Sequence, residues 1–143
     1  MAERVITCRC GAVAMAVEGP PILAAACHCD DCQAGGRQLE ALPEAPKVLG
    51  PGGGTDYLLI RRDRVRVVQG AERLREHRLK PGSKTRRVAA SCCGTPMYVD
   101  VQVAHWGDLY RDRLPDAPPV EMRVMTKFAP PGSIPDDGLP HHR

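Results

Sequence analysis

The sequence predicts a mainly β protein, built of short antiparallel strands around metal-binding cysteines. Many short apolar runs are separated by glycine, proline and polar turn residues, which is the pattern of an all-β or mainly β domain. In residues 97–103, apolar and polar side chains alternate as they do on a half-buried strand. Seven cysteines fall into three tight groups, a distribution typical of metal ligands.

The expected strands follow one another along the chain. The run 13–17 carries Val13, Met15 and Val17 at every second position, which sends these side chains to one face of a sheet. Residues 97–103 form the clearest strand, because Met97, Val99, Val101 and Val103 alternate with polar residues. The expected strands are residues 4–7, 13–17, 22–26, 57–60, 64–68, 74–79 and 97–103.

The other segments have weaker patterns. Residues 33–42 have helical composition, but Gly35 and Gly36 would cost a helix about 2 kcal/mol relative to alanines. We therefore expect one irregular turn of helix or a loop there. The glycines and prolines of residues 43–56 predict a loop, either a flexible surface connection or a flap over a metal. A short helix is expected over 105–114, and a strand or helix over 120–128.

Length and composition predict one domain with a modest core. Residues 1–128 are expected to form a single zinc domain, and 129–143 a Pro/Gly-rich tail with a frayed end at 139–143. The chain has only one Trp, one Phe and three Tyr, so its core is aliphatic. A structural metal would add stability, because ligands that assemble only in the folded state turn binding free energy into folding free energy.

Charge and hydropathy narrow the possible partners. The net charge is only +3, with 17 acidic residues among 20 Lys and Arg, so a polybasic nucleic-acid binder is not expected. No apolar run is long enough to span a membrane, and no apolar signal core follows the first residues. We expect a cytoplasmic protein that binds no membrane, and the sequence leaves its oligomeric state open.

The three cysteine groups can form at most two zinc sites. Disulfides are the alternative, but the cysteines are odd in number and no export signal places them in an oxidising compartment. If Cys27, Cys29 and Cys32 hold one ion, a fourth tetrahedral position stays vacant there. The other four cysteines would then meet in a closed, structural site: Cys8, Cys10, Cys92 and Cys93.

The open site favours sulfur chemistry over hydrolysis. Three thiolates around zinc leave a formal charge of about −1, so bound water would be less acidic than at a three-histidine site, where its pKa is about 7. An external thiol suits this soft coordination and would arrive as a thiolate near neutral pH. We therefore expect Cys27, Cys29 and Cys32 to be the catalytic residues, with a small thiol such as glutathione as the partner.

Residues near the open site have two interpretations. His28, Asp30 and Asp31 lie within the cluster and have the chemistry to move a proton. In an extended segment, however, His28 would point away from the neighbouring cysteines. Thr55 and Asp56, which follow the glycines, are comparable candidates.

The arginines are interpreted mainly as part of a half-solvated sheet. Arg64 and Arg66 would share one side of a strand, opposite Val65 and Val67. The alternatives are a basic face, or one arginine that pairs with the carboxylates of an anionic thiol. The set is Arg61, Arg62, Arg64, Arg66, Arg86 and Arg87.

Three ordered cysteine motifs carry a resemblance that covers about residues 4–103. They are CxCG at Cys8 to Gly11, CHCxxC at Cys27 to Cys32, and Cys93-Gly94 followed by Thr95-Pro96. The chain resembles the glutathione-dependent formaldehyde-activating enzyme family, also called CENP-V/GFA-like, as an uncharacterised branch. The resemblance implies a β-tent fold, two zinc ions, and a carbon-sulfur lyase activity of the S-(hydroxymethyl)glutathione synthase type. By resemblance, Cys8, Cys10 and Cys93 are structural, and Cys27, Cys29 and Cys32 catalytic.

The chain departs from this family at one ligand position. The family's CxxCG motif would place a cysteine at Ala90, whereas here Cys92 adjoins Cys93, so the fourth ligand of the structural site is left open. The leading hypothesis is a zinc-dependent carbon-sulfur lyase-type enzyme that acts on a small-thiol adduct. The alternative is a non-catalytic two-zinc module that binds a protein or nucleic-acid partner. The fold and the metal sites do not fix the substrate.

Overall fold

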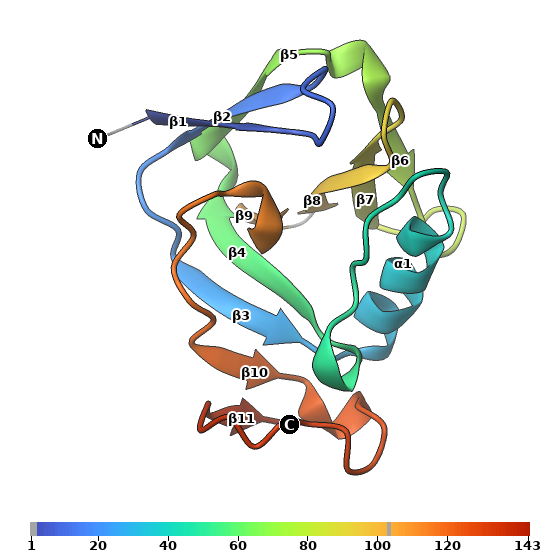
Figure 1. Ribbon diagram of the computed structural model, residues 1–143, viewed down its shortest axis with the longest axis vertical. Helices are drawn as coiled ribbons and strands as arrows, with labels where there is room; N and C mark the ends of the chain where they lie inside the picture. The colour runs from blue at the N-terminus through green and yellow to red at the C-terminus, as the bar shows by residue number, and fades with distance from the viewer. Residues whose placement is uncertain (1–2, 103) are drawn as a thin grey trace.

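The computed structural model describes residues 3–102 and 104–143, and these form a mainly β protein of two sheets with one α-helix (Figure 1). The smaller sheet has the order β1-β2-β5, and the larger sheet the order β11-β10-β3-β4-β9-β8-β7-β6. The predicted fold class is therefore confirmed. Neighbouring strands are antiparallel except on the two sides of β10. The strands are β1 Glu3–Thr7, β2 Ala14–Glu18, β3 Leu23–Cys27, β4 Thr55–Arg61, β5 Val65–Gln69, β6 Leu74–His77, β7 Thr85–Ala90, β8 Thr95–Val101, β9 Trp106–Tyr110, β10 Met122–Val124 and β11 His141–His142.

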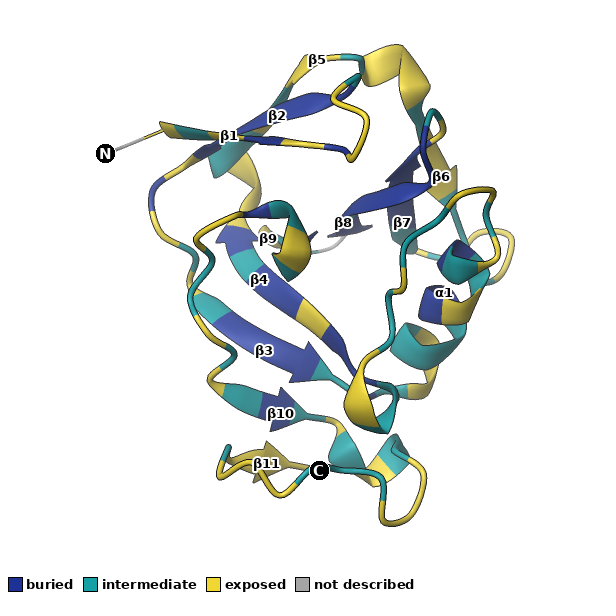
Figure 2. Ribbon diagram, viewed as in Figure 1, coloured by how far each residue is buried: buried dark blue, intermediate teal, exposed yellow. Residues whose placement is uncertain are grey.

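The main core lies between the two sheets. Buried side chains of β1 and β2 pack against those of β4, β8 and β9. Figure 2 shows by colour which residues along these strands are buried. The alternation in 13–17 is confirmed in part, because Val13, Met15 and Val17 all enter this core but the alanines between them are buried as well. The predicted strand over 97–103 is confirmed as far as Val101, and Val103 lies outside the described residues.

The helix α1, Asp30–Glu40, corrects the prediction of an irregular turn at 33–42. It begins earlier than the composition indicated, because the Cys29 side chain caps it by accepting a hydrogen bond from the Cys32 amide. Two acidic residues in its first turn further stabilise the helix, because their negative charges lie near the positive end of the helix dipole. The glycines are tolerated because they make room for neighbours: a Cβ at Gly35 would lie 2.2 Å from Nε of Arg87.

Replacing Gly35 by alanine is expected to destabilise the protein, although alanine is the better helix former. The added methyl group must displace the buried guanidinium of Arg87, so the free energy of unfolding should fall by about 1–3 kcal/mol. Without the clash, the same change would raise it by about 1 kcal/mol. Urea denaturation of Gly35→Ala in wild-type and Arg87→Ala backgrounds separates the two terms. An equal loss in both backgrounds would contradict this explanation.

The prediction of a helix over 105–114 is wrong. Residues Trp106–Tyr110 form β9, an interior strand paired with both β4 and β8, and Arg111–Arg113 form one turn of 3-10 helix after it. Two flanking ladders of backbone hydrogen bonds outweigh the weak local helical preference of this segment. Within 120–128 both alternatives occur, as the strand β10 and then a 3-10 turn at Thr126–Phe128.

The end of the chain is not frayed as predicted. β11 pairs in parallel with β10, and Asp137 accepts two hydrogen bonds from Arg123, at 3.1 and 2.6 Å. The division at residue 128 into a domain and a tail stays a prediction. Among the described residues, no helix is both long and apolar enough to cross a membrane.

Candidate metal centres

The first candidate centre joins four cysteines from two turns. Cys8 and Cys10 follow β1, and Cys92 and Cys93 connect β7 to β8. The sulfur of Cys8 lies 3.7 Å from that of Cys10 and 3.8 Å from that of Cys92, and the Cys92 and Cys93 sulfurs are 3.9 Å apart. A tetrahedral zinc with bonds of about 2.3 Å sets its sulfurs about 3.8 Å apart. The four thiols are therefore arranged to hold a metal such as zinc.

The turn that carries the two late cysteines is tight. The amide of Gly94 donates to the Ala90 carbonyl at 2.8 Å, and Gly94 has a φ of 69°. A side chain there would also lie 2.7 Å from the Pro43 carbonyl. This turn brings Cys92, the ligand that the sequence left open, into the group with Cys93. Burial opposes ionisation of Cys93, but a hydrogen bond from the Thr95 hydroxyl lowers its pKa to about 6.

The second candidate centre lies where β3 meets α1. Cys27 ends the strand, Cys29 caps the helix and Cys32 lies in its first turn, and all three thiols are half-buried. Their sulfurs lie within 4.8 Å of one another. Hydrogen bonds from Cys27 and Cys32 lower the pKa of Cys29 to about 2. The hydrogen bond between Cys27 and Cys29 raises the pKa of Cys27 to about 11. The group thus provides one thiolate readily, and a metal would have to displace the protons of the other two.

A buried arginine lies beside this second centre. Arg87 on β7 is only 3% exposed and contacts Cys32, and its charge also favours the thiolate of Cys29. The expectation of a half-solvated sheet is confirmed for Arg61 and Arg66, which are exposed on β4 and β5, but it is wrong for the buried Arg87. Arg62 and Arg64 lie in the 3-10 turn between β4 and β5, and not on a strand. The sequence signal for Arg87 was slight, since only the missing side chain at Gly35 marks the space that it fills.

Tyrosines and one acid complete the surroundings. The Tyr57 hydroxyl lies 3.9 Å from the Cys32 sulfur, and its ring packs against that of Tyr110 with centroids 5.3 Å apart. Burial raises the pKa of Asp108 to about 6, and the charge of Arg87 opposes this effect. Because cross-strand partners share a face, these side chains lie on the face of the large sheet that carries Cys27.

His28 does not join the cysteines on either side of it. Its side chain is fully buried, with Nε2 3.2 Å from the Arg123 guanidinium and Nδ1 3.0 Å from the Gly52 carbonyl. Since the guanidinium only donates, Nε2 accepts and Nδ1 donates to Gly52. The prediction that His28 points away from the cysteines is borne out, and its role is to connect the cysteine turn to the loop and to β10. Asp30 and Asp31 are exposed.

The glycine-rich loop is anchored over α1. One oxygen of Glu40 accepts hydrogen bonds from the amides of Val48 and Leu49, at 2.7 and 2.9 Å. Gly54 packs on the His28 ring, where a Cβ would lie 2.6 Å from Cε1. These contacts hold the loop in place, and its action as a flap over a metal stays a prediction.

The fold and the two thiol groups define a small mainly β protein with two candidate metal centres. The chain belongs to a family of unknown function, DUF6151, whose model matches residues 2–110. Among solved structures it resembles a protein of Rhodobacter sphaeroides, with 21% sequence identity, coverage of 81% of this chain and 92% of that chain, and a TM-score of 0.57. This likeness concerns the fold alone. No curated protein matches the chain.

Proposed function

We propose that the protein is a zinc-dependent enzyme of the carbon-sulfur lyase type that acts on the adduct of a small thiol and an aldehyde. In this proposal zinc occupies both cysteine groups, and Cys27, Cys29 and Cys32 form the catalytic one. The resemblance to the formaldehyde-activating family motivates the reaction, with glutathione as one candidate thiol. Thiolate ligands favour a soft or borderline metal such as zinc.

The observation that carries the proposal is the difference between the two cysteine groups. One offers four sulfurs and can close a tetrahedral site, whereas the other offers three among the described residues. A three-ligand zinc site keeps a position for substrate. The adjacent guanidinium of Arg87 offsets the negative charge that three thiolates bring, and the half-buried sulfurs leave access from solvent.

The chemistry needs neither an oxidant nor a reductant. In the addition direction, the thiol sulfur bonds to the aldehyde carbon, the carbonyl π electrons move to oxygen, and the thiol proton ends on that oxygen. In the lyase direction the carbon-sulfur bond breaks and the hydroxyl proton returns to sulfur. Zinc would supply a low-pKa position for the thiol, which would then react as a thiolate. The three cysteines would hold the metal, and Arg87 would stabilise the developing charge nearby.

Exchange spectroscopy tests the proposal directly. In a mixture of formaldehyde and glutathione, zinc-loaded protein is expected to accelerate the exchange between free thiol and its hydroxymethyl adduct, measured by NMR. Cys29→Ser should lose the whole acceleration because it loses one metal ligand. Ser91→Ala, which alters an exposed hydroxyl beside the other centre, is the matched control and should keep it. Equal rates with wild type and Cys29→Ser would refute a catalytic role for this centre.

The non-catalytic alternative has its own observation. Ile22 and Trp106 are 62% and 46% exposed and line one surface hollow, which a protein partner could cover. If the protein retains both zinc ions and no thiol adduct exchanges faster in its presence, the binding-module hypothesis becomes the better one.

A further inference from the structure

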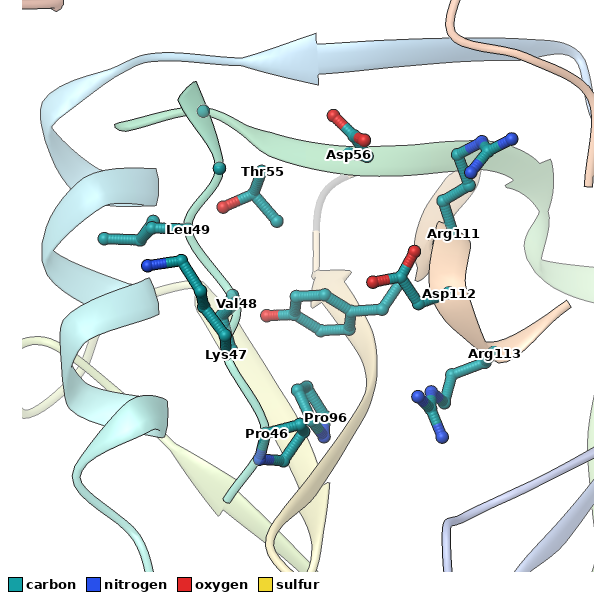
Figure 3. Close-up of a pocket in the computed structure, with 13 residues that line it drawn as sticks. Pro46, Lys47, Val48, Leu49, Thr55, Asp56, Pro96, Arg111, Asp112 and Arg113 are labelled. Carbon is teal, nitrogen blue, oxygen red and sulfur yellow. The ribbon is translucent and has the colours of Figure 1, made fainter. Parts of the chain in front are cut away.

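A cavity of about 280 Å³ lies between the glycine-rich loop and the ends of β4 and β9 (Figure 3). Residues 46–50 form one wall, and Thr55, Tyr110 and the 3-10 turn Arg111–Arg113 form the other. Its volume is near the lower limit for small-molecule sites. It therefore has room for a ligand of amino-acid size.

Two residues that line this cavity carry buried hydroxyls with no partner in hydrogen-bond geometry among the described residues. Thr55 is 2% and Tyr110 5% exposed; no group is within hydrogen-bond geometry of the Thr55 Oγ1, and the Tyr110 hydroxyl has only that of Tyr57 near it. Burying an unsatisfied hydroxyl costs free energy, so such groups in a native protein call for a partner. Two of them at the wall of one cavity are the polar groups expected in a site built to orient a ligand.

Charges of both signs surround the two hydroxyls. Lys47, Arg111 and Arg113 bring positive charge to the cavity, and Asp56 and Asp112 bring negative charge. In Figure 3 the labelled Asp56, on β4, and Arg111, at the start of the 3-10 turn after β9, lie at the same end of the cavity. Arg111 is partly occupied, since it donates to the Pro118 carbonyl at 2.9 Å. A mixed lining of this kind suits a zwitterion, whose carboxylate and ammonium groups need opposite partners.

The cavity adjoins the three-cysteine centre. Thr55 is the cross-strand partner of Cys27, and such partners have Cβ atoms about 4.5–5.5 Å apart. Tyr110 is the partner of Tyr57, whose hydroxyl contacts Cys32. The described residues that line the cavity include no cysteine, so a ligand seated there would have to extend its sulfur past Thr55 to reach the metal ligands.

We propose that this cavity binds the amino-acid portion of a small aminothiol, such as cysteine or homocysteine, and directs its sulfur to the centre formed by Cys27, Cys29 and Cys32. The proposal rests on the proposed function and narrows its thiol to one that carries a free carboxylate and a free ammonium group beside the sulfur. The hydroxyls of Thr55 and Tyr110 bind the carboxylate, with the nearby cations in support, and Asp112 binds the ammonium group.

A titration of cobalt-substituted protein with small thiols tests this specificity, because a sulfur that binds the metal changes its visible absorption. L-cysteine is expected to bind about 10- to 100-fold more tightly than 2-mercaptoethanol, the ratio given by one lost charge-assisted hydrogen bond or a pair of them. Cysteamine, which lacks the carboxylate, and 3-mercaptopropionate, which lacks the ammonium group, should fall between them. Glutathione should bind more weakly than cysteine.

Two variants assign the effect to the cavity. Thr55→Val and Tyr110→Phe should each weaken cysteine binding about three- to tenfold and leave 2-mercaptoethanol binding unchanged. Tyr98→Phe is the matched control, because Tyr98 is the cross-strand partner of Leu109 and so lies on the opposite face of the sheet from Tyr110. Thermal denaturation of both variants should show no loss of stability, since each removes an unsatisfied hydroxyl.

The outcomes distinguish the two proposals. If every thiol binds equally well, the cavity does not select the ligand and this inference fails while the proposed function stands. If glutathione binds most tightly, recognition of free amino and carboxyl groups beside the thiol is wrong, because in glutathione both of these groups are in peptide bonds. If no thiol changes the cobalt spectrum, the proposed function itself fails and takes this inference with it.

Discussion

Replacing Cys29 by serine is expected to lower the zinc content from about two ions per chain to about one, because an open site that keeps only two of its three thiol ligands should release its metal. Cys29 has a second task as the cap of α1, where its sulfur accepts the Cys32 amide at 3.2 Å. Serine is itself a good helix cap. The fold should therefore survive, and the loss should be confined to the metal.

Mass spectrometry of the metal content, together with a thermal melt, measures this result. The serine variant should melt within a few degrees of the wild type, since the four-cysteine centre is untouched. Ser91→Ala serves as the control and should retain two ions, because its hydroxyl is exposed and belongs to neither group. Unchanged zinc content in Cys29→Ser would remove the group Cys27, Cys29 and Cys32 as a metal site.

Replacing Cys8 by serine should have the larger effect on stability. The four-cysteine centre joins the turn after β1 to the turn between β7 and β8. Cys8 and Cys92, which it brings together, are 84 residues apart in the chain. Binding free energy at a structural zinc site is folding free energy. The loss of this binding free energy is comparable to the whole free energy of unfolding of a domain, so the melting temperature should fall by about 15 °C or more.

Chelation separates metal loss from local packing in this experiment. Wild type and Cys8→Ser should differ strongly in zinc-containing buffer and converge when a chelator has removed the metal. If they still differ by the same amount in the chelator, the destabilisation comes from the buried Cys8 side chain itself, which is 2% exposed and accepts the Val13 amide at 3.3 Å. That result would contradict a structural metal at this centre.

The sequence was sufficient for the β class and for the grouping of the cysteines. Strand alternation and turn residues are local signals, and most expected strands are found within a residue or two of their predicted positions. The pairing of the first and last cysteine groups followed from counting ligands, because three thiols near one another in the chain already account for one site. Geometry then added Cys92, which the family motif had left open.

The errors have one cause, which is that long-range contacts override local preference. From the local sequence, Gly35 and Gly36 indicate a broken helix. In the structure the side chains of Arg87 and Leu49 occupy the space that these glycines leave, and the helix continues through them. The local pattern of the segment 105–114 indicates a helix, but in the structure two neighbouring strands pair with it. The cavity beside the second centre was equally hidden, because Thr55 and Tyr110 come from strands far apart in sequence.

The parallel pairing of β3 with β10 has a consequence for the order of events during synthesis. Arg123 contacts His28 across 95 residues, and the Val124 carbonyl accepts the His28 amide at 3.0 Å. A ribosome adds about 5–20 residues per second, so the cysteine turn waits roughly 5–20 s for the strand that covers its flank. Throughout this interval the side of the turn that carries His28 has no strand beside it. Metal can thus enter before the covering segment arrives, and so can an oxidant.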